Sequence, residues 1–209
     1  SDHSLALEPH STIQPRQAFN VKSMNPKVYI ITGPIGSGKS TVCAHLKKKG
    51  YLTVDLDIVS KNILDSQESL PFLKSNFENC FRDGKIDRKL IAEIVFTDRV
   101  KLKILENFLH PLVTEELAKI ISNSKSHLFI EVSAPKTIHN NYPTLVIIAS
   151  EDVRRERLKN RGMSHKDIEN RIKTQPNEEW WRSLGTVVEN DELSNLEEKL
   201  DDVLNLSNE

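Results

Sequence analysis

Residues 33–40 read G-P-I-G-S-G-K-S, which fits the phosphate-binding pattern G-x-x-x-x-G-K-[ST] at every fixed position. The octapeptide follows a short apolar run, 28–32 (V-Y-I-I-T), and precedes a helical pattern over 40–49 that Gly50 ends. A strand before and a helix after are the context in which this pattern binds a nucleoside triphosphate. The stretch therefore predicts a site for ATP or GTP. Taken alone, it leaves kinase, GTPase and ATPase open.

The residues of this loop suit an anion for separate physical reasons. Glycines let the backbone turn tightly and approach the phosphates, and exposed amides at a helix N-terminus attract negative charge. We expect Lys39 to reach the β- and γ-phosphates and the Ser40 hydroxyl to bind Mg²⁺. The residues expected to hold the nucleotide are Gly33, Pro34, Ile35, Gly36, Ser37, Gly38, Lys39, Ser40 and Thr41.

The rest of the chain alternates short apolar runs with helical patterns. Further apolar runs occupy 52–55, 128–132, 144–149 and 186–189. Runs of this length between helices predict buried parallel strands, and hence an α/β fold with an open, doubly wound parallel sheet of five strands flanked by helices.

The predicted helices divide the chain further. Patterns over 86–96 and 99–108 are helical, with Asp98 as a cap between them. His110-Pro111 breaks the pattern, which resumes over 111–121. Ser164 and Ser194 each precede an acidic residue by three positions, as in capping boxes that open a helix.

The domain prediction is one domain over 24–209, preceded by a polar leader or native extension over 1–23. Within the domain we expect a core formed by 27–57 and 125–209, a helical insertion over about 58–124 and a helical lid over about 154–182.

Charge and composition argue against several classes of protein. The net charge of -1 argues against a dedicated nucleic-acid binder. No apolar run approaches the roughly 20 residues of a membrane span, and residues 1–23 lack a secretory signal. The two cysteines, Cys43 and Cys80, have no metal-ligand spacing, so a reducing, cytoplasmic location is expected.

Carboxylates stand where predicted strands end, which is where open α/β sheets bind ligands. Asp57 is the candidate base for an acceptor hydroxyl, and it is also placed to cap the following helix. Asp55 is either an outer ligand of Mg²⁺ or a polar strand end. Glu131, within an apolar strand, favours a role near the metal over a structural ion pair.

Three arginines, Arg154, Arg157 and Arg161, recur at helical spacing after the fourth strand. Such a cluster is either a salt-bridged surface or a lid that neutralises charge on the transferred group. Its place after the fourth strand of a phosphate-loop pattern favours the lid.

Seven stretches spread along the chain form a recognisable set: 31–41 (I-T-G-P-I-G-S-G-K-S-T), 54–57 (V-D-L-D), 86–96 (I-D-R-K-L-I-A-E-I-V-F), 110–112 (H-P-L), 157–161 (R-L-K-N-R), 171–175 (R-I-K-T-Q) and 187–190 (V-V-E-N). The P-loop itself is general, but I-D-R-K-L-I-A-E-I-V-F followed by H-P-L, at this spacing after V-D-L-D, is much more specific. With these stretches the chain, from about residue 27 to about 204, resembles the dephospho-coenzyme A kinase family.

The resemblance implies that ATP, with Mg²⁺, phosphorylates the ribose 3′-hydroxyl of dephospho-coenzyme A. It implies that Asp57 is the base and that Arg157 or Arg161 is the lid arginine near the phosphates. The insertion with Arg88 and His110 would bind the acceptor, although the histidine alone fits a core or capping role equally well.

Two further positions complete this comparison. Asn190 stands where the family has an asparagine near the adenine. Residues 133–137 (S-A-P-K-T) depart from the family's usual sequence after the third strand, on the side that faces the acceptor. The adjacent pair Trp180 and Trp181 favours core or lid packing over stacking on a base.

Two alternatives stay open at this point: another small-molecule kinase of the same fold, and an ATP-binding regulatory module that transfers no phosphate. A GTPase is weaker because no N-K-x-D segment follows a strand. The expected partners are ATP and dephospho-coenzyme A, with no nucleic acid or membrane. We expect a monomer or a weak homo-oligomer.

Overall fold

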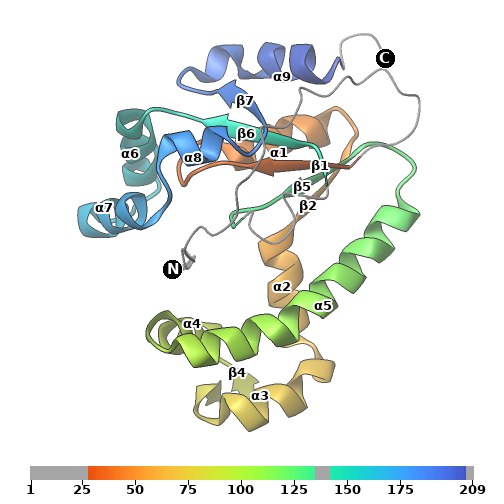
Figure 1. Cartoon of the computed structure of the whole chain (residues 1–209), viewed down its shortest axis with the longest axis vertical. Coiled ribbons are helices and arrows are strands. Elements are labelled where there is room, and N and C mark those ends of the chain that lie inside the picture. The colour runs from red at the N-terminus through yellow and green to blue at the C-terminus, as the bar shows by residue number, and fades with distance from the viewer. Residues whose placement is uncertain (1–27, 135–141, 206–209) are drawn as a thin grey trace. The chain divides into compact units, whose positions relative to one another are not determined.

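The computed structural model describes residues 28–134 and 142–205, which form two compact units. The sheet unit consists of residues 28–54 together with the described residues from 124 onward, and the helical unit consists of residues 55–123. The chain enters the helical unit where the second strand ends and leaves it at the end of a long helix (Figure 1).

The sheet unit contains a five-stranded sheet in the order β2-β5-β1-β6-β7. The strand β1 is central and pairs in parallel with β5 on one side and β6 on the other, and β6 pairs in parallel with β7. The predicted open parallel sheet is confirmed, and each predicted strand lies within a residue of its place. The bounds are β1 Val28–Thr32, β2 Leu52–Asp55, β5 Leu128–Glu131, β6 Thr144–Ile148 and β7 Thr186–Glu189.

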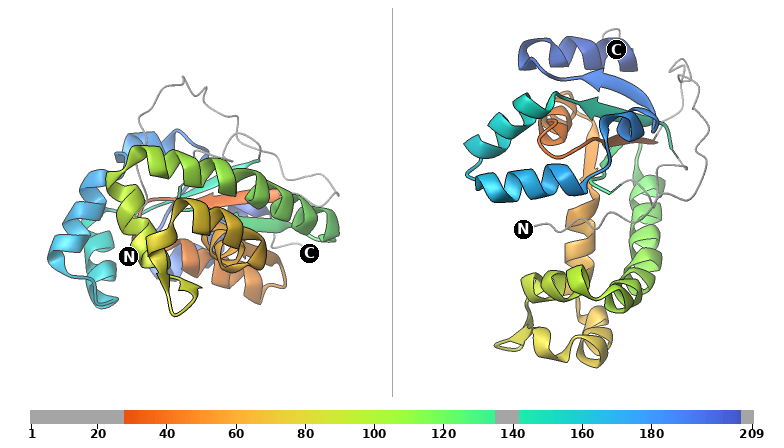
Figure 2. Two further views of the ribbon diagram at one scale, coloured as in Figure 1. Left: turned by 90° about the horizontal axis from the view of Figure 1, so that it is seen from below. Right: turned by 60° about the vertical axis from the view of Figure 1, so that its left-hand side comes forward.

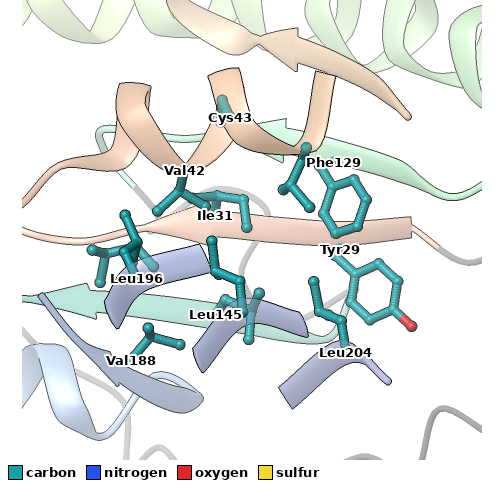
Figure 3. Packing of buried hydrophobic residues seen from close by; sticks show 12 residues of the cluster. Tyr29, Ile31, Val42, Cys43, Phe129, Leu145, Val188, Leu196 and Leu204 are labelled. Carbon is teal, nitrogen blue, oxygen red and sulfur yellow. The ribbon is translucent and has the colours of Figure 1, made fainter. Parts of the chain in front are cut away.

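Helices cover both faces of the sheet, as the alternating side chains of β6 require. Leu145 and Ile147 join the cluster packed under α1 (Lys39–Lys48) and α9 (Leu196–Leu204), which Figure 3 shows from close by. Val146 and Ile148 face the opposite way, toward α8 (Glu178–Arg182). Because both faces are covered, β6 is buried along its whole length and reads as an unbroken apolar run.

The predicted packing role of the tryptophan pair is confirmed. Trp181 is 2% exposed and belongs to the α8 cluster, and Trp180 packs against it edge to face. The indole N–H of Trp181 donates to the carbonyl oxygen of Pro176 at 3.1 Å, which satisfies its one polar group.

Two helices, α6 (Glu151–Asn160) and α7 (His165–Thr174), lie side by side at one end of the sheet (Figure 2). Ser164 Oγ accepts the backbone N–H of Asp167, so the predicted cap is confirmed. The predicted cap at Ser194 is wrong. A 3₁₀ turn over Leu193–Asn195 precedes α9, whose N-cap residue makes no side-chain bond.

The helical unit is built around its own apolar cluster, which includes Leu73, Phe77, Cys80 and Ile91. Asp98 Oδ1 accepts the N–H of Lys101 at 3.0 Å, which confirms it as a cap. Its elements are α2 Leu56–Asp65, α3 Leu70–Asn76, α4 Arg88–Thr97 and α5 Arg99–Asn123, with 3₁₀ turns Gln67–Ser69 and Glu78–Cys80 and a hairpin of β3 Phe81–Arg82 and β4 Lys85–Ile86.

The predicted break at His110-Pro111 is wrong, because α5 runs through Pro111 without interruption. A proline removes one N–H from the helical ladder, and a helix of 25 residues tolerates that single loss. Close by, Thr114 Oγ1 donates to the carbonyl oxygen of His110 at 2.8 Å.

Candidate active site

The phosphate loop connects the central strand β1 to the N-terminus of α1. Gly33, Gly36 and Gly38 have φ values of 154°, 79° and 101°, which other residues rarely adopt. Two of them also lack room for a side chain, because a Cβ on Gly33 would overlap the carbonyl of Ile147 and one on Gly38 would overlap the amide of Asn190. The glycines are therefore required by both the backbone conformation and the packing behind the loop.

Positive charge gathers at this loop. Lys39 Nζ donates to the carbonyl oxygens of Gly33 at 2.8 Å and Pro34 at 3.4 Å, so the ammonium lies across the loop. The first turn of α1 carries no acidic residue, which leaves the positive end of its dipole without a carboxylate of its own. The loop thus suits a polyanion.

Two of the three predicted metal ligands meet in the sheet unit. Ser40 Oγ donates to Glu131 Oε1 at 3.3 Å. The contact follows from the topology, since β5 pairs with β1 and Glu131 is in register with Ile31 at the carboxyl end. Among the described residues no three His, Cys, Asp or Glu side chains group into a metal site. A hydroxyl and one carboxylate fit Mg²⁺, which takes few protein ligands and keeps water or substrate phosphates.

The third predicted ligand, Asp55, belongs to the helical unit and caps α2. Its Oδ1 accepts the backbone N–H of Asp57 at 2.9 Å and of Ile58 at 3.4 Å. The expectation that Asp57 caps this helix is therefore wrong: the extended backbone of Asp55 makes it the cap residue and places Asp57 in the first turn.

Two arginines of α6, Arg154 and Arg157, contact the loop. Arg157 Nη1 lies 3.3 Å from the carbonyl oxygen of Gly36 and 3.2 Å from that of Ser37, and Nη2 donates to that of Asn190 at 2.6 Å. Burial lowers the pKa of Arg157, and the positive charge of Arg161 lowers it further. The interpretation of the whole cluster as a salt-bridged surface fails for Arg157, whose guanidinium donates to loop and strand-end carbonyls.

Asn190 is a buried residue that supports the phosphate loop through a hydrogen bond. Its side chain is fully buried, and its Nδ2 donates to the carbonyl oxygen of Ser37 at 2.8 Å. Its backbone N–H donates to the carbonyl oxygen of Ile148 at 2.7 Å, which continues the pairing of β7 with β6 by one residue. The predicted contact of Asn190 with adenine stays a prediction.

Neighbouring Asp191 holds the start of α6. Its Oδ1 accepts the backbone N–H of Ser150, the N-cap residue of α6, at 2.7 Å. This hydrogen bond lowers the pKa of Asp191, with smaller contributions from Arg157 and Lys199. The carboxylate thus ties the end of β7 to the helix that carries the arginines.

The remaining predicted residues lie in the helical unit. Arg88, in the first turn of α4, is half exposed and pairs with Asp65 at the end of α2. His110 is exposed in the interior of α5, so it is neither a core residue nor a cap. Contact of Arg88 and His110 with an acceptor stays a prediction.

Two residues with contacts at the loop and at α6 were not predicted. Gln175 Oε1 accepts the backbone N–H of Ile35 at 2.9 Å. Arg155, rather than its neighbours, carries the ion pairs of α6, with Glu151, Asp152 and Glu169. The acidic residues three and four positions before Arg155 were a readable sign of it. Gln175 ends the family-like stretch 171–175, but no spacing in that stretch points to Ile35.

The segment that departs from the family's usual sequence is described only at Ser133 and Ala134, and residues 135–137 lie outside the described chain.

Among the described residues, no helix combines the length and the hydropathy that crossing a bilayer demands.

A five-stranded parallel sheet with this loop after its central strand defines a P-loop kinase fold. The fold recurs in shikimate kinase from Acinetobacter baumannii, which has a TM-score of 0.52 at 14% identity and covers 88% of this chain and 96% of its own. The dephospho-CoA kinase family model matches residues 28–196, and the chain belongs to that family.

Relatives and solved structures agree with this assignment. A dephospho-CoA kinase of Thermus thermophilus is 34% identical over 192 residues, covering 88% of this chain and 93% of its own length. That of Aquifex aeolicus is 35% identical over 169 residues, covering 77% and 86%. The crystal structure of TT1252 from Thermus thermophilus has a TM-score of 0.80 at 32% identity, covering 88% of this chain and all of its own. The protein is thus a kinase, and the non-catalytic regulatory module loses its support.

Proposed function

We propose that this protein transfers the γ-phosphoryl group of ATP to the ribose 3′-hydroxyl of dephospho-coenzyme A, giving coenzyme A and ADP. The observation that carries the proposal is the glycine-shaped phosphate loop at the N-terminus of α1, in a chain that belongs to this kinase family. In the transfer, the acceptor oxygen bonds to the γ-phosphorus while the bond from that phosphorus to the bridging oxygen breaks. The hydroxyl proton must leave to a base.

The sheet unit supplies the electrostatics. Lys39 and the loop amides hold the phosphates, and Ser40 with Glu131 would hold Mg²⁺. When bound, Mg²⁺ neutralises charge that develops on the phosphate oxygens. Asp55, occupied as a helix cap, is proposed to act on the metal only through bound water.

Asp57 is proposed as the base that takes the proton of the acceptor hydroxyl. It lies in the first turn of α2, directly after the edge strand β2, and capping falls to Asp55 instead. Arg88 and His110 are proposed to bind the acceptor from the helical unit. Both are exposed enough to meet a soluble ligand.

Arg157 and Arg161 divide the task of the lid. We propose that Arg157, tied to three carbonyls, stabilises the loop and the charge beside it. Arg161, the exposed residue that caps the C-terminus of α6, is proposed to meet the phosphates of ATP. Asn190, which supports Ser37 from behind, is proposed to act on the nucleotide through the loop.

The test measures coenzyme A and ADP formed from Mg²⁺-ATP with dephospho-coenzyme A, beside a panel of nucleoside and sugar acceptors. Equal amounts of both products, with dephospho-coenzyme A as the preferred acceptor, are expected. Turnover of another acceptor but not of dephospho-coenzyme A would make the protein a different small-molecule kinase. Tight ATP binding without transfer to any acceptor would point to a regulatory module.

The role of Asp57 is tested in the same assay. Asp57→Asn should keep Mg²⁺-ATP affinity within about twofold and lower kcat by about 10²-fold or more, the usual worth of a general base. Asp83→Asn is the matched control, since Asp83 is an exposed turn residue with φ 51°, a conformation that asparagine adopts readily. Unchanged transfer by the Asp57 variant removes this residue from the mechanism.

We further propose that the protein acts in the cytoplasm as a monomer or weak homo-oligomer, with ATP and dephospho-coenzyme A as its partners and no nucleic acid or membrane. Sedimentation at micromolar concentration checks the oligomeric state, and a stable dimer there contradicts this part.

A further inference from the structure

The backbone N–H and the carbonyl oxygen of Ile35, in the middle of the phosphate loop, are both bonded by side chains far away in the sequence. The N–H donates to Gln175 Oε1 at 2.9 Å, and the carbonyl oxygen accepts from Arg154 Nε at 2.8 Å. Ile35 is a central residue of the turn that the Ser37 N–H closes by donating to the carbonyl oxygen of Pro34 at 3.1 Å. The turn leaves the polar groups of Ile35 itself to be bonded elsewhere, and the two side chains bond them.

The helix α6 lies directly against the loop at this point. A Cβ on Gly36 would come within 3.0 Å of the carbonyl oxygen of Arg154 and 3.2 Å of its Cα. Arg154 is 7% exposed, and burial lowers its pKa. A guanidinium so deeply buried needs acceptors inside the protein, and the Ile35 carbonyl is one of them.

Gln175 does not need its side chain to end α7. Its backbone N–H, as the helix cap, donates to the carbonyl oxygen of Arg171, so the main chain closes the helix. The side chain reaches back 140 residues to the loop instead. The two anchoring helices are also braced against each other, because Arg155 Nε pairs with Glu169 of α7 at 2.8 Å.

We propose that Gln175 and Arg154 are positioning residues that fix the two peptide groups on either side of Ile35 and thereby keep the phosphate loop ready for Mg²⁺-ATP. The proposal rests on the proposed function for its ligand. Neither side chain is assigned to the reacting atoms. Both act through the backbone between them, so their loss weakens nucleotide binding and leaves the chemical step intact.

The test replaces only the acceptor atom. Gln175→Met keeps the length of the side chain and removes the acceptor, whereas Gln175→Glu restores an oxygen that accepts the Ile35 N–H. Lys173→Met introduces the same side chain at an exposed position two residues earlier, and serves as the control. Arg154→Lys, which keeps the charge but not the Nε geometry, tests the second anchor.

The first readout is the Kd of Mg²⁺-ATP together with the split between KM and kcat. Gln175→Met should raise Kd and the KM for ATP about fivefold, the worth of one net hydrogen bond, with kcat within twofold. Lys173→Met should match the wild type. Gln175→Glu keeps the acceptor oxygen but adds a negative charge beside a site for a polyanion, so it should match the wild type only in the hydrogen-exchange readout. A Gln175→Met variant with wild-type Kd overturns the proposal, and so does one that loses kcat alone.

The second readout is amide hydrogen exchange in the ligand-free protein, which needs no nucleotide. The Ile35 amide should exchange faster in Gln175→Met than in the wild type or in Lys173→Met, with melting temperatures alike. Equal exchange in all three contradicts the anchoring. A wild type that binds no Mg²⁺-ATP refutes the proposed function, and the exchange result still decides the anchor.

Discussion

Replacing Gly38 by alanine should destabilise the protein more than replacing Gly50 by alanine, although the two glycines have similar positive φ values. Gly38 has φ 101°, and a Cβ there would overlap Nδ2 of Asn190. Gly50, near the other end of α1, has φ 94° and open space around it. The two positions share the strain of a left-handed residue and differ only in the neighbour.

The magnitude follows from two contributions. A non-glycine residue at such a φ costs about 1–2 kcal/mol, which should be the whole effect of Gly50→Ala. In Gly38→Ala the side chain of Asn190 must also move, and its 2.8 Å bond to the buried carbonyl of Ser37 is lost. The Ser37 carbonyl still accepts from Arg157, but the buried amide of Asn190 is left without its acceptor, which adds about 1–3 kcal/mol. Gly38→Ala should therefore cost about 2–5 kcal/mol in total.

Urea denaturation followed by tryptophan fluorescence measures both variants, and Mg²⁺-ATP titration reports the loop. The variant Asn190→Ala lacks the side-chain atom that a Cβ at residue 38 would overlap. In this variant, adding Gly38→Ala should lower the free energy of unfolding only by the cost of the backbone strain. If Gly38→Ala is no more destabilising than Gly50→Ala, or costs the same with and without Asn190, the packing argument for this glycine is wrong.

Two more predictions concern stability. Burial alone raises the pKa of Asp201, but hydrogen bonds and charges from Lys49 and His45 outweigh it and hold the pKa below its ordinary value. A carboxyl whose pKa is lower in the folded than in the unfolded protein stabilises the fold at pH values above its unfolded-state pKa. This stabilisation is lost as the pH falls through the folded-state pKa. The melting temperature of Asp201→Asn should thus lie below that of the wild type by its full amount near neutral pH, and the difference should shrink below about pH 4. A difference that grows in acid contradicts this assignment. Pro111→Ala should raise the free energy of unfolding by about 1–3 kcal/mol in urea, because the ring is exposed within α5 and blocks one helical bond; a loss of stability would mean that α5 depends on the proline.

The sheet could be predicted closely from the sequence because buried parallel strands read as unbroken apolar runs. The left-handed glycines of the loop, and the strand and helix on its two sides, could be predicted because the motif requires them. The pairing of Ser40 with Glu131 was expected only as a shared role near the metal, but it follows once β5 is known to lie beside β1.

The helical unit was harder to predict for local reasons. The hairpin at Asp83-Gly84 was missed although D-G is a strong turn signal, and both residues adopt positive φ there. Pro111 was given too much weight, because one missing N–H does not end a long helix. The link from Gln175 to Ile35 joins a side chain to a peptide 140 residues away, and no local pattern encodes it.

The helical unit is one uninterrupted stretch, 55–123, that closes around its own core, with Leu73 and Cys80 completely buried. The residues proposed to hold the phosphates, Lys39 and Ser40 among them, all lie outside that stretch. A change in the core of the stretch can therefore be repacked within the stretch, and it leaves the sequence of the phosphate loop untouched.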